Sequence, residues 1–383
     1  MKGKRWICLF LAVFFVGIAG FMAFNYYVDP LDYFAVRKGD ETCDANTYTR
    51  ASKVEYVLKH KDEIEAVTMG GSKSGGLSTQ LLTEYTGKKY YNFFYNAGNF
   101  SDYLKYIRFL AENTDISEVT LHLSSFEVNY FTREDTDNPY YQIPAAMTGS
   151  KWEELQENLN YLMTDLKTTW KAFLEGENRN INLLDLTTGE KLWTNAQKKI
   201  AGDPEGYAEK YVATDFEYHL KRLFGQKASE YTAFDQNIEA LKEIKAVCEE
   251  HGITLKVVIG ASFIGERDTY ECYRYYSYLR ELVSITDVWD FSDFNEVNMN
   301  PYNFYDRKHY TNEVADLIVR TMYGKESREG FGVYLTEDNI DDYLDQRIGD
   351  FRKLEEEFEQ TGTVALPGME DDSFISAGEA AAS

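Results

Sequence analysis

An uncharged apolar run near the amino terminus constrains this chain more than any other feature. The run extends from Trp6 to Val28, which is about the 20 residues that a helix needs to cross the hydrocarbon core of a membrane. Lysine and arginine precede the run, whereas Asp29 and Asp32 follow it. This asymmetry predicts a single-pass anchor over residues 1–28, with the amino terminus in the cytoplasm and the main domain extracytoplasmic.

A cleaved signal peptide is the alternative interpretation of the same run. Signal peptides normally have an apolar core of about 7–15 residues and a small-residue cleavage site. The run here is longer, Ala19 and Gly20 match such a site poorly, and Tyr26 and Tyr27 stand where interfacial aromatic residues are expected. We therefore favour the anchor, although the sequence alone leaves cleavage open.

Composition narrows the classes of partner and cofactor. The chain of 383 residues has a formal net charge of −24, whereas nucleic-acid binding needs clustered lysine and arginine. Nucleic acid is therefore not expected as a partner. The four cysteines show no C-x-x-C spacing, so we predict neither a zinc site nor a disulfide framework, and we expect no cofactor or metal.

Short apolar strands alternate with amphipathic helices over much of the chain. The expected strands are residues 64–70, 89–98, 118–125, 253–260 and, as the last, 287–293. The expected helices are residues 77–87, 102–113, 234–252, 270–284 and 311–324. This alternation is typical of βαβ units and a mostly parallel sheet. The predicted fold is a flavodoxin-like three-layer α/β/α domain with a helical insertion.

The pattern also predicts where the domain is divided. An extended lead-in follows the anchor over residues 28–50, and the alternation breaks over a polar, mostly helical insertion or cap that contains a short apolar run at residues 180–186. The predicted segments are residues 29–130 and 228–330 for the α/β domain, 131–227 for the insertion, 331–360 for a helical extension and 361–383 for a disordered tail.

Ser72 is the candidate nucleophile. It follows the first strand in "MGGSKSGG" and precedes a helix, and ligands of open α/β sheets bind at the carboxyl ends of the strands. Glycines before the serine permit a tight turn that would expose its hydroxyl. A phosphate-binding loop is an alternative, but the order G-x-x-x-x-G-K-[ST] is absent. A plain glycine and serine turn is the other alternative.

The partner of this serine is expected in "FYDRKHYTNEVADLIV". Asp306 and His309 lie in a loop-like stretch just before the final helix of the alternation. Of the five histidines, only His309 falls in a loop after a late strand, where a base could face the first strand's end. Lys73 and Lys308 flank the expected site and could attract an anionic group, but we favour the interpretation that they are solvated.

These two motifs together resemble the SGNH, or GDSL-like, hydrolase superfamily over roughly residues 66–320, without the insertion. Its first block, G-[DST]-S, is matched by Gly70, Gly71 and Ser72, with glycine in place of the usual middle residue. Its last block, D-x-x-H, is matched by Asp306 and His309. The apolar amino terminus and the "VDP" after it are similar to the membrane-anchored extracytoplasmic branch, which includes DltD-like and AlgJ/AlgX-type O-acylation proteins.

The resemblance implies a Ser-His-Asp triad. Ser72 would be the nucleophile, His309 the general base and then the general acid, and Asp306 the group that orients the imidazole. The N–H groups of Ser72 and Gly98 and a side-chain amide would form the oxyanion hole. The implied partners are a cell-surface glycan or glycopolymer and a membrane-bound O-acyltransferase that delivers the acyl group.

The identity of that amide is open. The family has an asparagine after the third strand, where this chain has "SSFEVNYF". Asn129 comes late in this stretch, and Ser124 or Ser125 could take its place. Asn96 and Asn99, beside Gly98, are rival candidates for the same role.

Three functions are compatible with these observations. The favoured one is a serine acyltransferase or esterase that acts on a surface glycan through an acyl-serine intermediate. The second is a non-catalytic binding or assembly protein with a degenerate site, which Gly71 and the missing asparagine would fit. The third is a metal-dependent hydrolase with Asp306 and His309 as ligands, which lacks a second ligand cluster in the sequence.

Overall fold

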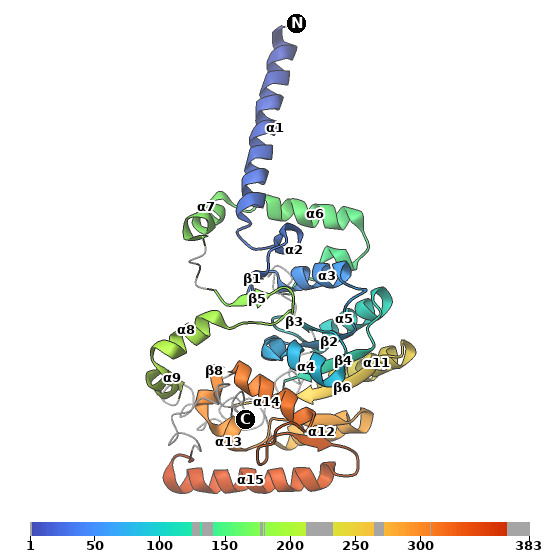
Figure 1. Cartoon of the computed structure of the whole chain (residues 1–383), viewed down its shortest axis with the longest axis vertical. Coiled ribbons are helices and arrows are strands. Elements are labelled where there is room, and N and C mark those ends of the chain that lie inside the picture. Colours follow the sequence, from blue (N-terminus) through green and yellow to red (C-terminus); the bar gives the residue numbers. More distant parts are fainter. Residues whose placement is uncertain are drawn as a thin grey trace.

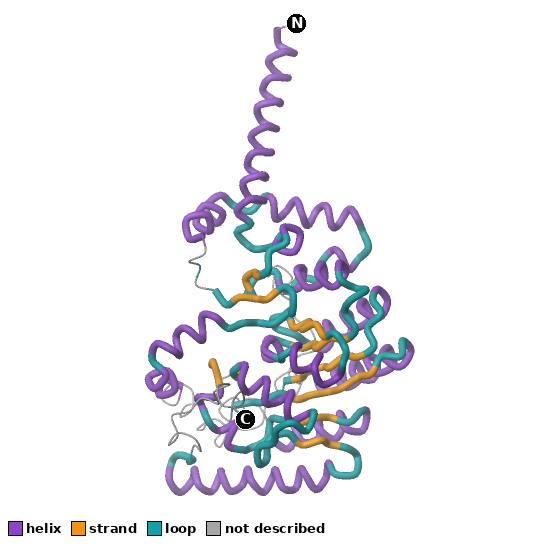
Figure 2. The backbone as a smooth tube through the Cα atoms, viewed as in Figure 1, coloured by secondary structure: helices purple, strands orange, loops and turns teal. Residues whose placement is uncertain are grey.

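A long amino-terminal helix stands apart from the rest of the chain, which folds around one central sheet (Figure 1, Figure 2). The structure is a computed structural model that describes residues 2–124, 131, 141–176, 179, 181–211, 233–263, 272–306 and 308–365. The amino-terminal helix, α1, covers Lys2–Val28, and its segment Lys4–Val28 is long and apolar enough to cross a membrane.

The central sheet has six strands in the order β10-β7-β6-β4-β2-β3. Their bounds are Ala66–Gly70 for β2, Tyr90–Phe94 for β3, Glu118–Leu123 for β4, Thr254–Ile259 for β6, Val288–Asp290 for β7 and Val333–Leu335 for β10. All neighbours pair in parallel except β10, which is antiparallel to β7. The predicted α/β class with a mostly parallel sheet is confirmed.

Hydrophobic cores cover both faces of this sheet. Alternate side chains of a strand point to opposite faces, so Val67 and Met69 of β2 belong to one core while Ala66 belongs to the other. The first core includes α5 (Phe100–Asn113), α11 (Phe234–Glu250) and α12 (Cys272–Ile285), and the second includes α4 (Thr79–Thr86) and α14 (Asn312–Met322). Each of these helices overlaps a helix expected from the sequence.

Capping side chains fix where α4 and α14 begin. Ser78 accepts a hydrogen bond from the N–H of Leu81 at the start of α4, and Thr311 caps α14 in the same way. Such caps satisfy backbone donors that a helix leaves without partners in its first turn. They set the length of the loops after the strands, and those loops carry the candidate site.

The lead-in and the insertion are more structured than the sequence indicates. The expectation of an extended lead-in is wrong, because this segment forms α2 (Ala35–Lys38), β1 (Thr42–Asp44) and the start of α3 (Thr49–Lys59). β1 pairs antiparallel with β5 (Leu183–Asp185) of the insertion. The other described elements of the insertion are η3 (Ala145–Met147), α6 (Lys151–Leu162), α7 (Leu166–Glu175), α8 (Thr194–Gly202) and α9 (Pro204–Tyr211).

The carboxyl-terminal part also departs from the expectation. Residues 287–293 are not the last strand, because a small hairpin of β8 (Phe304–Asp306) and β9 (His309–Tyr310) and then β10 follow. The extension expected to be helical therefore begins with a strand that joins the sheet, and continues as α15 (Ile340–Thr361). Most of the predicted tail, residues 366–383, lies outside the described residues.

A buried ion pair holds α15 against the sheet. The Arg347 guanidinium lies 2.6 Å from Asp290 at the end of β7, and both side chains are fully buried. Tyr343 donates to the same carboxylate at 3.0 Å, and Arg347 also donates to the carbonyl oxygen of Ser292 at 3.1 Å. A buried charge that loses its partner is strongly destabilising, so this pair couples the helix to the sheet.

We expect Arg347→Met to lower the free energy of unfolding by about 3–5 kcal/mol, because Asp290 would remain buried without its partner. Lys353→Met on the same helix is the control. Lys353 pairs with Asp350 at the surface, and losing such a pair costs less than about 1 kcal/mol. Urea unfolding of the full chain in detergent measures both, and equal effects would contradict a special role for the buried pair.

Candidate active site

Ser72 lies at the carboxyl end of β2, where the short helix η1 (Ser72–Gly76) begins. The residues on both sides of it are buried, whereas Ser72 itself is partly exposed. A side chain at Gly70 would put its Cβ 2.6 Å from the carbonyl oxygen of His122 and 2.7 Å from Ser74 Oγ, so only glycine fits there. The tight strand-to-helix turn therefore presents the Ser72 hydroxyl at the carboxyl edge of the sheet.

The three residues of the predicted triad meet at this edge. Ser72 Oγ lies 2.7 Å from His309 Nε2, although the two residues are 237 positions apart in the chain. His309 Nδ1 lies 2.8 Å from each carboxylate oxygen of Asp306. Both distances fall within the normal range for hydrogen bonds. The arrangement is a continuous chain of hydroxyl, imidazole and carboxylate.

The β8–β9 hairpin fixes the Asp306 carboxylate. One of its oxygens accepts hydrogen bonds from the N–H groups of Lys308 at 2.8 Å and His309 at 2.9 Å. Burial alone would raise the pKa of Asp306, but the His309 charge and these hydrogen bonds outweigh it and lower the pKa to about 2. Asp306 is thus ionised at any pH near neutrality and can stabilise a protonated His309.

A buried histidine lies behind the serine turn. His122 of β4 is fully buried, and its Nε2 lies 2.8 Å from the hydroxyl of Tyr310, the residue after His309. Burial, followed by the charge of Lys73, lowers the pKa of His122 to about 3, so this imidazole is neutral and acts as a structural support.

The two lysines beside the site differ in their surroundings. Lys308 is exposed, as the sequence interpretation has it, but the same interpretation is wrong for Lys73. Lys73 is buried, and its Nζ donates to Ser262 Oγ at 3.2 Å. Ser262 follows β6, so Lys73 joins two strand ends beneath the serine turn.

The predicted oxyanion-hole residues lie in the loop after β3. A Cβ at Gly98 would lie 2.9 Å from the Cα of Gly71 and 2.6 Å from the hydroxyl of Tyr103, so this loop packs directly on the serine turn. This proximity fits the expectation that the N–H groups of Ser72 and Gly98 act together. Their joint role in binding an oxyanion stays a prediction.

The asparagine candidates for the amide role are engaged elsewhere. Asn96 Nδ2 donates to the carbonyl oxygen of Ala45 at 2.8 Å. Asn99 caps α5 by accepting from the N–H of Asp102 at 3.0 Å, and its Nδ2 donates to the Asp102 carboxylate at 2.9 Å. Ser124 is buried at the end of β4, whereas Asn129 and Ser125 lie outside the described residues. The amide donor therefore stays unassigned.

Two residues of the insertion complete the wall of the site, and sequence reasoning missed both. The Trp193 ring centroid lies 4.7 Å from that of His309 and 4.9 Å from that of Tyr305. Lys191 Nζ lies 3.8 Å from the centre of the Trp193 ring, and its backbone N–H donates to the Gly75 carbonyl oxygen at 2.7 Å. Trp193 has a positive φ of 50°, and no sequence motif reveals either residue.

Lys191 places a titratable charge beside the triad. Burial lowers the pKa of its ammonium to about 8, and the negative charges of Asp306 and Asp44 oppose this shift without cancelling it. The ammonium lies over an indole face, where a cation is attracted by the ring. Lys191 thus places a positive charge over the Trp193 ring at neutral pH, and this charge is progressively lost as the pH rises through about 8.

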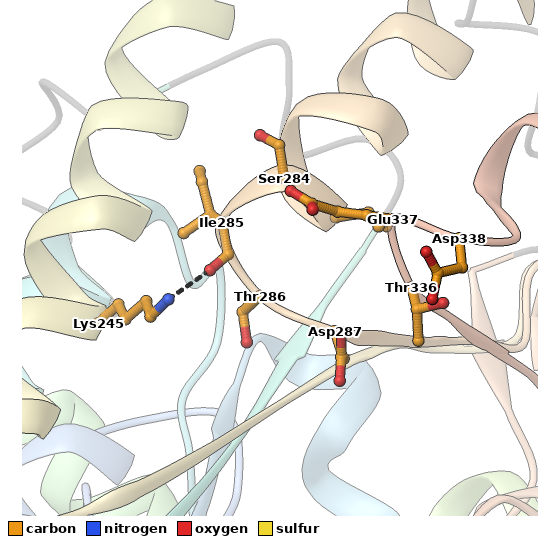
Figure 3. A pocket seen from close by; sticks show the side chains of 9 residues that line it. Lys245, Ser284, Ile285, Thr286, Asp287, Thr336, Glu337 and Asp338 are labelled. Carbon is orange, nitrogen blue, oxygen red and sulfur yellow. Dashed lines mark hydrogen bonds between the residues drawn. The ribbon is translucent and has the colours of Figure 1, made fainter.

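A pocket of about 620 Å³ lies away from Ser72 (Figure 3). It is lined by Lys245, Val283, Ser284, Ile285, Thr286, Asp287, Thr336, Glu337 and Asp338. These residues surround the start of β7, at the sheet edge opposite the one that carries Ser72, and Lys245 Nζ donates to the Ile285 carbonyl oxygen there at 2.7 Å. The pocket is therefore separate from the candidate active site.

Metal ligation has no candidate cluster in the described part of the chain, where no three His, Cys, Asp or Glu side chains are placed to hold an ion. Among known proteins, neither a protein-family model nor a curated sequence matches the chain. The candidate function therefore depends on the geometry at Ser72.

We expect a fluorescence transition of Trp193 with a midpoint near pH 8, because the Lys191 ammonium over the indole becomes a neutral amine as the pH rises. The measurement is the difference in tryptophan emission between wild type and Lys191→Met from pH 6 to 10. Lys151→Met, which changes an exposed lysine near Trp152, should keep the transition. A transition near pH 8 that persists in Lys191→Met would contradict the assignment of this transition to Lys191.

Proposed function

We propose that this protein is a membrane-anchored, extracytoplasmic SGNH-type serine acyltransferase or esterase. Its substrate class is a cell-surface glycan or glycopolymer, which it would acylate or deacylate. The observation that carries the proposal is the hydrogen-bonded chain of Ser72, His309 and Asp306 at the carboxyl edge of a parallel sheet. Serine nucleophiles with an adjacent base and an orienting carboxylate are typical of acyl transfer.

The strand order supports this proposal. Numbered among themselves along the chain, the five parallel strands lie in the order 2-1-3-4-5, since β3, β2, β4, β6 and β7 are neighbours in this sequence. That is the order of flavodoxin-like sheets, which bind ligands at the carboxyl ends of their strands. Ser72 directly follows β2, and Gly98 belongs to the loop after its neighbour β3.

The chemistry would proceed in two halves. Ser72 Oγ attacks the carbonyl carbon of an acyl donor while His309 Nε2 takes the hydroxyl proton, and the negative carbonyl oxygen accepts hydrogen bonds from the N–H groups of Ser72 and Gly98. The bond to the leaving oxygen then breaks as His309 returns the proton to it. A hydroxyl of the acceptor glycan, or water, attacks the acyl-Ser72 ester by the reverse sequence.

The amino-terminal helix supports the proposed location. The segment Lys4–Val28 is long and apolar enough to span a membrane, and its most apolar stretch of 18 residues is not buried within the protein. The basic residues before it favour a cytoplasmic amino terminus and an extracytoplasmic domain. A membrane-bound O-acyltransferase would be a suitable acyl donor for a domain held at this surface.

A non-catalytic binding protein on the same fold is the second candidate function. The observation that favours it is the engagement of Asn96 and Asn99, which leaves the oxyanion hole without an assigned side-chain donor. If the protein only binds a glycan, a variant with Ser72 replaced should still bind that glycan. If it is an enzyme, the same variant should lose acyl transfer and ester hydrolysis.

We expect a fluorophosphonate probe to label Ser72, with the labelled peptide identified by mass spectrometry. Ser72→Ala should abolish labelling, and His309→Ala or Asp306→Asn should slow it by about 10³-fold or more, because the hydroxyl would lose its base or the base its orientation. Ser117→Ala and His60→Ala change the same residue types at the surface and should have no effect. A folded protein that is never labelled at Ser72 would favour the binding protein.

Gly98→Ala tests the oxyanion hole. Its new Cβ would push against Gly71 and Tyr103, so we expect labelling of Ser72 to slow by about 10²-fold, as is typical for the loss of an oxyanion donor. Gly202→Ala adds a methyl group where no atom lies within 4 Å and should leave the rate unchanged. Equal rates in the two variants would remove Gly98 from the mechanism.

A further inference from the structure

Two helices of the insertion lie across the lower end of α1, far from the candidate active site in the fold (Figure 1). They are α6 and α7, and with the loop between them they form residues 151–175. We call this segment the collar. It packs against the base of α1, whereas α8 and α9 of the same insertion lie toward β8 and the triad.

The first collar helix, α6, is amphipathic in the opposite sense to a helix of a soluble domain. Two of its polar residues face the protein: Glu157 accepts from the N–H of Ala145 at 3.0 Å, and Asn158 Oδ1 accepts from the Tyr33 hydroxyl at 3.1 Å. Its apolar residues are exposed. They are Trp152, Leu155 and Leu159, followed by Met163 just after the helix. A water-facing helix normally buries its apolar stripe and exposes its polar one.

The second collar helix, α7, repeats this inversion. Thr169 is buried and donates to the Asn25 side chain of α1 at 2.6 Å. The exposed apolar residues are Leu166, Trp170, Phe173 and Leu174, with Trp170 52% and Leu174 68% exposed. A contiguous apolar surface of this kind marks an interaction site on a protein.

This surface is continuous with the apolar surface of α1. The Phe24 ring lies 6.2 Å from that of Trp170 and 5.9 Å from that of Phe173, measured between centroids. Asn25 donates to the carbonyl oxygens of Leu162 and Thr164 at 2.8 Å each. The collar therefore begins where the lipid-facing part of α1 would end.

The length of α1 agrees with this position. From Lys4 to Phe24 the helix rises roughly 30 Å at about 1.5 Å per residue, which is about the thickness of a bilayer's hydrocarbon core. Asn25 comes directly after this span, and its side chain makes three hydrogen bonds to the collar. With α1 crossing a bilayer, the collar would lie at the depth of the lipid headgroups.

We propose that the collar is a membrane-interface element whose apolar face lies in the outer leaflet of the bilayer that α1 crosses. Helices with one apolar face and a polar opposite face lie in the plane of this interface, and tryptophan is enriched there. Exposed acidic residues on α6 and lysines on α7 give no strong net charge, so apolar burial drives the contact. The inference requires α1 to be membrane-embedded but not that Ser72 be catalytic.

Quenching of tryptophan fluorescence by brominated lipid tests this inference. The full chain carrying Trp6→Phe, which removes the tryptophan at the far end of α1, is reconstituted into phosphatidylcholine vesicles with or without bromine near the headgroup end of the acyl chains. We expect bromine to quench the emission. Adding Trp152→Phe and Trp170→Phe should remove more than half of that quenching, whereas adding Trp289→Phe, a change in the central sheet, should preserve it.

A charge variant gives an independent test on the same vesicles. Leu159→Glu places a charge on the apolar face and should reduce the quenching of Trp152 at least twofold, while Asn160→Glu places it on the neighbouring exposed position and should have a smaller effect. Absence of quenching, or quenching that is unchanged without Trp152 and Trp170, would overturn the proposal. A protein partner would then be the remaining occupant of the face.

Discussion

At the carboxyl edge of the sheet, the backbone at two glycines lies very close to one buried residue, His122, and the candidate site depends on this packing. A Cβ at Gly260 would collide with its imidazole, and one at Gly70 would collide with its carbonyl oxygen. The close approach buries the ring completely, which keeps it uncharged. A neutral ring can share a hydrogen bond with the Tyr310 hydroxyl, and that bond holds the residue directly after His309. The position of the candidate base is therefore supported from inside the sheet by Gly70, the first residue of the Ser72 motif, and by Gly260, which belongs to neither motif of the triad.

Sequence reasoning succeeds here where a local pattern determines the structure. Apolar runs ending in glycine predict β2 and β6, and the rule that parallel strands share one carboxyl edge brings Ser72 near His309 across the whole domain. It fails where a residue's surroundings come from a distant segment. Lys73 is buried, and its ammonium contacts Ser262 after β6, 189 positions away in the chain. Trp193 reaches the imidazole because the insertion folds back on the serine turn, and no periodicity in the chain encodes that contact.

Charge is distributed unevenly in this protein. The chain carries a formal net charge of −24, yet the two cations next to the serine turn, Lys73 and Lys191, are buried behind it. Charges with little water around them act over longer distances than solvated ones. The buried lysines therefore place positive charge near Ser72, together with the negative charge of Asp306, within an acidic molecule. The same insertion that supplies Lys191 also packs on the base of α1, so the wall of the site and the support of the anchor belong to one segment.

The three hydrogen bonds of Asn25 have a mechanical consequence. Many anchored domains hang from a flexible linker and sample a hemisphere around their attachment point. Here the helix joins the domain through buried polar contacts within a few residues of its end, so the tether has almost no slack. With α1 in a membrane, this joint would hold the domain at one fixed height above the lipid surface. With the proposed anchor in a membrane, the domain would meet its substrate by lateral diffusion in two dimensions, and an acceptor polymer of the proposed class would have to bend to the height at which Ser72 is held.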